Sequence, residues 1–390
     1  MLSSNDIAKL LEMKDVLVRK IENDSKSTWI HVEMPVKEHR CPHCGNMTSN
    51  IHDYREQTVR DLDSFGKEIF LRYRKRRYKC PICHKVFYEE SPIVHKYQRN
   101  TQRLYLHVLE SFRYLTSGSE IARQHHLSPT TVFRYLDVLS FKNTHLPEVL
   151  SLDEFKGNSG GERYNCILTD AKNHKVLDIL RSRKEQDLYN YFLQFPERKT
   201  VKYVVIDMNG HFDRIAACCF PKALVIVDRY HVTRQVFWAL DNVRKQEQKN
   251  LSAQYRKYFK RSRKLLYKSP NKLTSSEKEQ LILMFEYAPR LGLAYQLKND
   301  LLEVMHSENS FQARPKLSKW IFEAESFKLP EFQACLTCYH NWFDVILRSL
   351  DVPYSNGYTE GMNGKIKAFK RISFGMPNFN HLRTRILFSA

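Results

Sequence analysis

The spacing of hydrophobic residues predicts helices in the N-terminal third of the chain and a short strand near its beginning. Residues 1–40 predict a short helix from Ile7 to Leu17, followed by a strand around Trp29 to Met34. Residues 101–142 show helical periodicity, because apolar side chains recur every three or four positions. The residues that share one face of this predicted helix are Leu104, Val108, Leu109 and Phe112.

From residue 147 the pattern changes to strands. VLSLDEF, RYNCILTD and KVLDILRS follow closely on one another, and an amphipathic helix is predicted from Gln186 to Phe195. Two apolar strands, KYVVIDM and ALVIVD, come next with a short helix between them. Strands that are apolar throughout are typical of a sheet covered on both faces, so the pattern predicts a mixed α/β sheet. Residues 232–350 are predicted to be almost entirely helical.

The charge of the chain indicates a polyanionic partner. Lysine and arginine number 63 against 43 acidic residues, which gives a formal net charge of +20 in 390 residues. Nucleic acid is the commonest polyanion in a cell, whereas a protein that is basic without a charged partner is the simpler alternative. The sequence shows no signal peptide and no apolar run long enough to span a membrane. Nine cysteines, an odd number, suit a reducing compartment, so we expect a cytoplasmic protein.

Two Cys-x-x-Cys motifs predict one structural zinc site. Cys41 and Cys44 form the first motif, and Cys80 and Cys83 form the second, with 35 residues between the two motifs. Four thiolates complete the tetrahedral shell of Zn²⁺ and leave no open position, so the site is expected to be structural. The alternative is two unrelated pairs of buried cysteines. A third pair, Cys335 and Cys338, has no partner motif and is interpreted as buried thiols.

Two segments near the zinc motifs have the composition of DNA-binding elements. The segment RYRKRRYK before the second motif interleaves cations with aromatic residues, which suits a strand that contacts phosphates; a solvated edge strand is the alternative. Residues 119–136 have the pattern of a helix-turn-helix, with Ser128 as the cap and Pro129 as the first residue of the second helix. The residues predicted to contact DNA in these two segments are Arg72, Arg74, Lys75, Arg76, Arg77, Thr130, Thr131 and Arg134.

Three acidic residues stand in places that suit a metal site. Asp153 lies in the first strand of the α/β region, Asp207 ends an otherwise apolar strand, and Glu360 lies near the start of a helix. Phosphodiester chemistry without a protein nucleophile uses a pair of divalent ions, and Mg²⁺ prefers a few carboxylates with open positions. Two further acids stand in similar positions. Asp228 also ends an apolar strand, and Glu154 is adjacent to Asp153, although only one of two neighbours in a strand can face the metals.

The chain resembles the DDE transposases of the ISL-three insertion-sequence family. The similar motifs run nearly end to end: RRYKCPIC, SEIARQHHLSPTTVFRYLD, LDEFKG, VVIDMNGHF, VIVDRYHV and NGYTEGMNGKIKAFKRISFGMPNFNHLRTRI. The resemblance implies an RNase H-like core whose first and fourth strands are adjacent. It also implies a catalytic triad of Asp153, Asp207 and Glu360 that binds two Mg²⁺ ions, with Mn²⁺ as a substitute. Asp228 and His231 are interpreted as support near the site.

We therefore expect a multidomain protein in which an all-helical insertion interrupts the catalytic core, since the interval between Asp207 and Glu360 exceeds what a plain core requires. The stretch 244–268 within it holds ten cations and one acid. The predicted divisions are a zinc-binding module at 1–98, a helix-turn-helix at 99–145, core segments at 146–235 and 346–390, and the insertion at 236–345.

The predicted function is that of a transposase that binds terminal inverted repeats and catalyses Mg²⁺-dependent strand cleavage and strand transfer. Double-stranded DNA is the expected partner, both as element ends and as target, with a homodimer or larger assembly on DNA in a prokaryotic cell, associated with the nucleoid when acting. Cations after Glu360 are predicted to neutralise phosphates: Lys365, Lys367, Lys370 and Arg371. The alternatives are a DNA-binding regulator derived from a transposase and an RNase H-like structure-selective nuclease.

Overall fold

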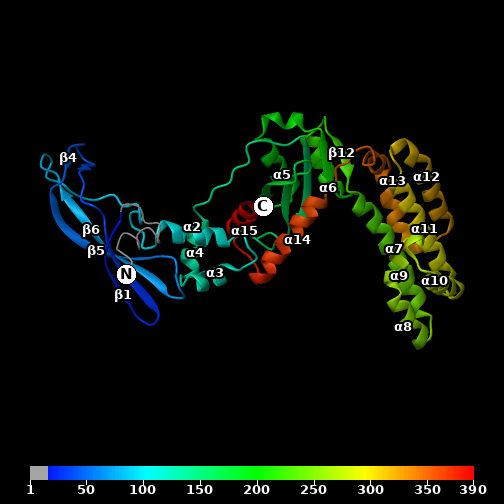
Figure 1. Ribbon diagram of the computed structural model, residues 1–390. Helices are drawn as coiled ribbons and strands as arrows, with labels where there is room; N and C mark the ends of the chain where they lie inside the picture. Colours follow the sequence, from blue (N-terminus) through cyan, green and yellow to red (C-terminus); the bar gives the residue numbers. More distant parts are fainter. Residues whose placement is uncertain (1–15) are drawn as a thin grey trace. The chain divides into compact units, whose positions relative to one another are not determined.

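The computed structural model describes residues 16–390, which divide into two compact units (Figure 1). Unit 1 comprises the described residues up to Ser140 together with 369–374, and unit 2 comprises residues 141–368 and 375–388. The helix predicted from Ile7 to Leu17 falls on residues outside the described part, except that Leu17 begins a strand. Within residues 16–390, no helix combines the length and the apolar character required to cross a membrane.

Unit 1 begins with a five-stranded sheet that is built around one long strand. Strand β6 pairs with β2 in parallel and with β5 and β7 in antiparallel fashion, and β1 extends the sheet beyond β2. The strands are β1 (Leu17–Asn23), β2 (Ser27–Glu33), β5 (Ile51–Arg60), β6 (Glu68–Lys79) and β7 (Val86–Tyr88), with a small β3 (His39–Arg40) and β4 (Met47–Thr48) pair. The strand predicted around Trp29 is confirmed as β2. Val32, Val59, Leu71 and Tyr73 form the centre of its core, with at most 1% exposure.

Three helices follow the sheet in unit 1: α2 (Gln102–Ser111), α3 (Gly118–Gln124) and α4 (Pro129–Leu136). The predicted start of α4 is confirmed, since Ser128 Oγ accepts a hydrogen bond from the backbone N–H of Thr131 and Pro129 is the first helical residue. Helix α3 approaches α4 closely at Gly118. A Cβ atom added there would lie 2.5 Å from the Phe133 ring, so any larger residue would force this ring to shift.

Unit 2 contains a five-stranded mixed sheet in the order β10-β9-β8-β11-β12. β8, β9 and β10 are antiparallel neighbours, whereas β11 and β12 run parallel to β8. The strands are β8 (Val149–Phe155), β9 (Asn165–Asp170), β10 (Lys175–Leu180), β11 (Tyr203–Ile206) and β12 (Leu224–Val227). All five were predicted from the alternation and apolar runs, and the mixed α/β sheet is confirmed.

Each face of this sheet has a different cover. Leu150 and Leu152 of β8 pack with helices α5 (Glu185–Phe192) and α6 (Gly210–Cys219). The intervening residues of β8, among them Ser151, point to the opposite face, where α14 (Gly357–Ile372) lies. Both faces are therefore buried, which explains why β11 and β12 are apolar throughout.

A long helical segment separates β12 from α14. Helix α7 leaves the sheet and packs against α11, which is followed by α12 and α13 (green to orange in Figure 1). The helices are α7 (Arg229–Lys249), α8 (Ala253–Arg261), α9 (Arg263–Tyr267), α10 (Ser275–Tyr287), α11 (Pro289–Met305), α12 (Ser310–Ser326) and α13 (Gln333–Arg348), and α15 (Phe379–Ser389) ends the chain. Trp320 anchors this core and donates its indole N–H to the carbonyl of Leu297 at 2.7 Å. Cys335 is buried here, as predicted, whereas Cys338 is half-buried and contacts Met208.

The helical core buries one lysine, and this gives a testable pH dependence. Lys298 is 1% exposed, and burial lowers its pKa to about 8. Between about pH 8 and pH 10.5 the unfolded chain binds this proton and the folded chain does not, so stability rises with pH there. We compare the free energy of unfolding of the wild type with that of Lys298→Met. The difference should shift in favour of the wild type by on the order of 1 kcal/mol per pH unit in this window, and it should be constant below the window.

Urea denaturation followed by tryptophan fluorescence measures this difference. The matched control is Lys319→Met, since the Lys319 side chain is 75% exposed on the neighbouring helix α12. Its difference from the wild type should stay flat between pH 8 and pH 10.5. An equally flat difference for Lys298→Met would show that this lysine is charged in the folded state.

Candidate functional site

Strand pairing brings two of the predicted acids to the same face of the sheet. In the parallel pair of β8 and β11, Val149 lies opposite Tyr203 and Ser151 lies opposite Val205. Asp153 lies two residues further along β8, and Asp207 directly follows the end of β11 at the corresponding position, so both continue the same face at the same level. Asp153 is 7% exposed, and the Asp207 side chain is 25% exposed.

Helix α14 covers this face and brings Glu360 to it. Thr359 Oγ1 lies 3.0 Å from Ser151 Oγ and 2.7 Å from Thr169 Oγ1, and all three hydroxyls are buried. One turn further on, the side-chain amide of Asn363 donates to Asp153 Oδ2 at 2.7 Å. Glu360 lies between these two attachments on the helix, so its position relative to the sheet is fixed on both sides.

His231, at the start of α7, connects the acids. Its Nε2 lies 2.8 Å from Asp207 Oδ2, and its Nδ1 lies 3.1 Å from Asp228 Oδ2 and 3.7 Å from Glu360 Oε1. In the described part of the chain, Asp228, His231 and Glu360 form a group whose ligand atoms all lie within 4.8 Å of one another. The predicted triad of Asp153, Asp207 and Glu360 is not a group with such short distances between its ligand atoms. Asp207 is joined to Glu360 through the imidazole, and Asp153 is joined to α14 through Asn363.

The acids repel one another, and this repulsion contributes to the raised pKa values of Asp153 and Glu360. Burial, together with the charge of Asp207, raises the pKa of Asp153 to about 7. Burial and the Asp228 carboxylate raise the pKa of Glu360. Burial opposes protonation of His231, but its hydrogen bonds to Asp207 and Asp228 prevail and raise its pKa to about 9. The cluster therefore favours a positive charge at its centre.

The geometry fits a cation. Asp207 Oδ1 is buried and has no hydrogen-bond partner among the described residues. It borders a cavity of about 320 Å³, which is also lined by Asp153, Asn209, His231 and Arg234. A buried carboxylate oxygen without a partner is costly unless a cation or another donor satisfies it. Oxygen ligands of this kind suit Mg²⁺.

Glu154 also borders the cavity, but it has a different partner. Its carboxylate forms an ion pair with Arg183, and it follows Asp153 on a strand whose side chains alternate between faces. The backbone N–H of Glu154 donates to Asp153 Oδ1 at 2.7 Å. Of these two neighbours, Asp153 is the one that faces α14.

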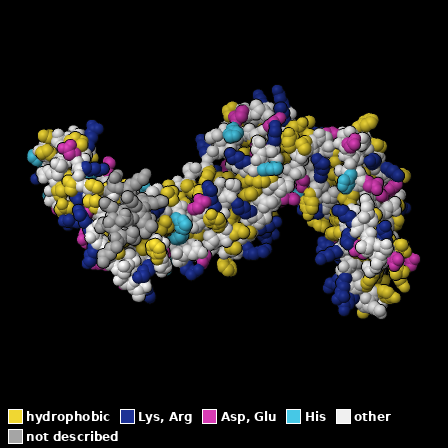
Figure 2. Space-filling model, viewed as in Figure 1, with side chains coloured by type: hydrophobic (Ala, Val, Ile, Leu, Met, Phe, Trp, Pro, Cys, Tyr) yellow, Lys and Arg dark blue, Asp and Glu magenta, His cyan; other side chains and the backbone are white. Residues whose placement is uncertain are grey.

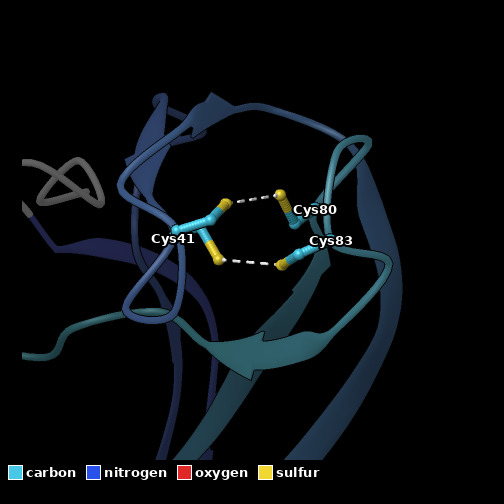
Figure 3. A group of neighbouring side chains, drawn as sticks. Cys41, Cys80 and Cys83 are labelled. Atoms are coloured by element: carbon cyan, nitrogen blue, oxygen red, sulfur yellow. Dashed lines mark hydrogen bonds between the residues drawn. The ribbon is translucent and has the colours of Figure 1, made fainter.

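The four predicted zinc ligands come together in unit 1. Cys41 Sγ lies 3.6 Å from Cys83 Sγ, and Cys44 Sγ lies 3.5 Å from Cys80 Sγ (Figure 3). All four sulfur atoms lie within 4.8 Å of one another. Zinc–sulfur bonds of about 2.3 Å in a tetrahedron place the sulfurs about 3.8 Å apart, so these thiols fit one structural Zn²⁺.

Backbone geometry preforms this site. The N–H of Gly45 donates to the Cys41 carbonyl at 2.9 Å, and the N–H of His84 donates to the Cys80 carbonyl at 3.0 Å. Both residues have a positive φ, +77° at Gly45 and +59° at His84, so the two turns are equivalent. Hydrogen bonds from the backbone N–H groups of Cys83 and Ile82 lower the pKa of Cys80 to about 6, which favours the thiolate that zinc requires.

Comparisons with known proteins identify the family of the chain. Residues 37–83 match a family described as the zinc-finger of transposase IS204/IS1001/IS1096/IS1165. Residues 150–386 match a transposase family of the ISL-three type, and this match includes Asp153, Asp207 and Glu360. The chain belongs to the ISL-three family of DDE transposases. It is 25% identical to the transposase for insertion sequence element IS1001 of Bordetella parapertussis over 91% of this chain and 89% of that protein. It is 32% identical to the transposase for IS1557 of Mycobacterium tuberculosis over 30% of this chain and 26% of that protein.

In this transposase, four of the five predicted contact residues of β6 are accessible. Arg72 and Arg74 are exposed, and Lys75 and Arg77 are half-buried. The guanidinium carbon of Arg74 lies 3.8 Å from the ring centroid of Tyr54, and that of Arg72 lies 4.8 Å from the ring centroid of Trp29. These rings hold the guanidinium groups at the surface of the strand.

Arg76 does not share this surface. It is 2% exposed, its guanidinium donates to the carbonyl of Met34, and it pairs with Glu33 and Glu89 at 3.6 and 3.4 Å. Arg76 is therefore a core residue of unit 1, and the prediction that it contacts phosphates is wrong for this fold. The carboxylates of Glu33, at the end of β2, and of Glu89, directly after β7, attract it inward.

The other predicted contact residues have accessible side chains. On α4, Thr130 and Arg134 are exposed and Thr131 is half-buried, while Val132 and Leu136 face the core. On α14, Lys367 and Arg371 are exposed, whereas Lys365 and Lys370 are half-buried. Thr359 and Asn363 were not among the residues predicted from the sequence. Asn363 comes three residues after Glu360 in the same helix, and this spacing is the signal that places both on one face.

Proposed function

We propose that this transposase binds the terminal inverted repeats of its element and cuts and joins DNA through Asp153, Asp207 and Glu360. The observation that carries the proposal is the convergence of β8, β11 and α14. Asp207 and Glu360 meet at the imidazole of His231, and Asp153, at the same level on the neighbouring strand, is bound by Asn363 of the helix that carries Glu360. The sheet order and the helical cover suit an RNase H-like core, in which the helices α7 to α13 are an insertion between Asp207 and Glu360.

Each residue has a distinct part in this proposal. Asp153, Asp207 and Glu360 would hold Mg²⁺ or Mn²⁺, which when bound activates water or a 3′-hydroxyl and stabilises the leaving oxygen. Asn363 orients Asp153 through its amide hydrogen bond, and His231 orients Asp207. Asp228 in turn fixes the ring of His231 at 3.1 Å. Asp228 and His231 thus remain supporting residues.

DNA contacts are assigned to the accessible cations and to the helix pair. Arg72, Arg74, Lys75 and Arg77 of β6 would contact phosphates, while Thr130, Thr131 and Arg134 of α4 would meet base edges in the major groove. Lys365, Lys367, Lys370 and Arg371 would flank the scissile phosphate. Both ends of an element must be joined in one complex, so a dimer or larger assembly forms on DNA.

The role of β6 can be measured by salt dependence. The double variant Arg72→Gln/Arg74→Gln is expected to bind end DNA more weakly and to flatten the slope of log K against log salt by roughly 2, since each lost phosphate contact removes about 0.9. Fluorescence anisotropy over a salt series gives this slope. The control Lys26→Gln changes an exposed cation in the β1–β2 turn and should leave the slope unchanged. An unaltered slope in the double variant would remove β6 from the interface.

A donor–target assay tests the function as a whole. Purified protein is incubated with Mg²⁺, an oligonucleotide duplex that ends in the element's inverted repeat, and a target plasmid. The proposal predicts cleavage at the repeat end and covalent transfer of that end into the plasmid. Cleavage without joined products would favour a structure-selective nuclease. Gel shift without cleavage under Mg²⁺ or Mn²⁺ would favour a DNA-binding regulator.

A further inference from the structure

The helical segment contains a groove that the catalytic proposal does not use. It lies between α8 and α10 and has a volume of about 580 Å³, within the range of sites that bind small organic groups. Three tyrosines line it and remain exposed: Tyr255 at 42%, Tyr258 at 41% and Tyr287 at 58%. The rings of Tyr255 and Tyr287 are 5.2 Å apart, one from each helix. The two rings cover part of each other, and their exposed parts are accessible to a flat partner.

The groove has a positive rim. Helix α8 carries four cations and no acid in nine residues, and Lys257 and Arg261 line the groove itself. Lys and Arg side chains gather at the end of the helical segment where α8 and α9 lie (Figure 2). On the facing helix, Glu286 is exposed beside Tyr287 but does not line the groove. The ligand is therefore expected to be flat and aromatic with attached negative charge.

We propose that this groove binds an unpaired stretch of a DNA strand, with bases stacked on Tyr255 and Tyr287 and phosphates held by Lys257 and Arg261. Exposed aromatic rings combined with cations are the usual platform for single strands, because every base offers a stacking face once it leaves the duplex. A paired duplex would use only the cations and leave the three rings in water. The inference rests on the proposed function, which supplies DNA as the partner.

The groove is distant from the catalytic residues. Helix α7 separates His231 from the start of α8 by about 20 residues, which is roughly 30 Å along one helix axis. At the duplex rise of about 3.4 Å per nucleotide, roughly nine nucleotides span this distance, and an extended unpaired strand needs fewer. The groove therefore holds a strand that extends from the site of cutting, and the scissile phosphate itself lies elsewhere.

Photo-crosslinking tests the proposal on the full chain. The probe is an end duplex with a single-stranded overhang of about 12 nucleotides, long enough for the distance above, that contains 5-iododeoxyuridine. It is irradiated without a divalent ion, so that the readout does not depend on catalysis. We expect crosslinked peptides that contain Tyr255, Tyr258 or Tyr287. Crosslinks confined to β6 and α4, or none at all, would overturn the proposal even if cleavage is intact.

Variants separate stacking from general structure. Tyr255→Ser/Tyr287→Ser should weaken binding of the overhang probe roughly 5- to 100-fold relative to the blunt duplex, while Tyr255→Phe/Tyr287→Phe should retain it because the rings remain. The control Tyr189→Ser alters an exposed tyrosine on α5 and should change neither. If the serine variant binds the overhang normally but alters the mass of the DNA-free protein in light scattering, the groove is a contact between two copies and the proposal is wrong.

Discussion

The Asp207→Asn variant is expected to lose Mg²⁺-dependent strand cleavage by on the order of 10³-fold or more while it still binds end DNA. A metal ligand contributes several kcal/mol to stabilising the transition state, and each 1.4 kcal/mol changes the rate about tenfold. The fold should survive, because the amide oxygen of asparagine can still accept the hydrogen bond that joins Asp207 to His231 at 2.8 Å. The Asp207 oxygen that lacks a partner is the one the substitution affects most.

Cleavage of end DNA on a denaturing gel and gel shift of the same DNA give the two readouts. Glu148→Gln is the matched control, since Glu148 precedes β8, is half-buried, and pairs with Lys172 and Lys202 rather than with the acidic cluster. It should cleave like the wild type. Undiminished cleavage by Asp207→Asn would exclude this carboxylate from the mechanism. Equal loss of cleavage and DNA binding would indicate misfolding instead.

Loss of zinc is the second change with a large expected effect. Cys80→Ser should reduce the zinc content from one ion per chain to none, because a structural site rarely retains the metal with three of its four thiolates and metal binding is itself a large part of the folding free energy. The small core around the site consists of Cys41, Tyr78, Cys80 and Phe87, so the effect should centre there. End binding should fall with it.

Elemental analysis gives the zinc content, and hydrogen exchange locates the structural effect. Protection should be lost around β3, β4 and β7 and retained near Val59 and Leu71, which belong to the separate core of the long strands. Cys218→Ser is the control, since Cys218 is exposed on α6 and should leave zinc unchanged. Full zinc occupancy in Cys80→Ser would show that another set of ligands holds the ion.

Local sequence signals predicted the secondary structure around the site well. The apolar strands that became β11 and β12 were recognisable because both faces are buried, and Ser128 followed by Pro129 marked the start of α4. The two Cys-x-x-Cys motifs predicted a four-thiol cluster because each motif forms its own tight turn. These features depend on neighbours in sequence, which explains why they could be predicted.

The remaining features depend on contacts between distant segments. Simple alternation places Arg76 with Arg72 and Arg74, but Glu33 and Glu89 attract it into the core. His231 follows Asp228 by one helical turn, and nothing in that spacing indicates that its other nitrogen reaches Asp207. The resemblance to the family selected the three acids, whereas the imidazole between them and the amide of Asn363 emerged only from the packing of α7 and α14.

We propose above all that Asp153, Asp207 and Glu360 converge on a pair of divalent ions when DNA is bound. Anomalous diffraction from a Mn²⁺-soaked crystal of the transposase with end DNA tests it most directly. We expect two manganese peaks about 3.5–4 Å apart, with oxygen ligands from all three acids and from the scissile phosphate. Manganese held instead by Asp228, His231 and Glu360, with Asp153 and Asp207 uncoordinated, would contradict it.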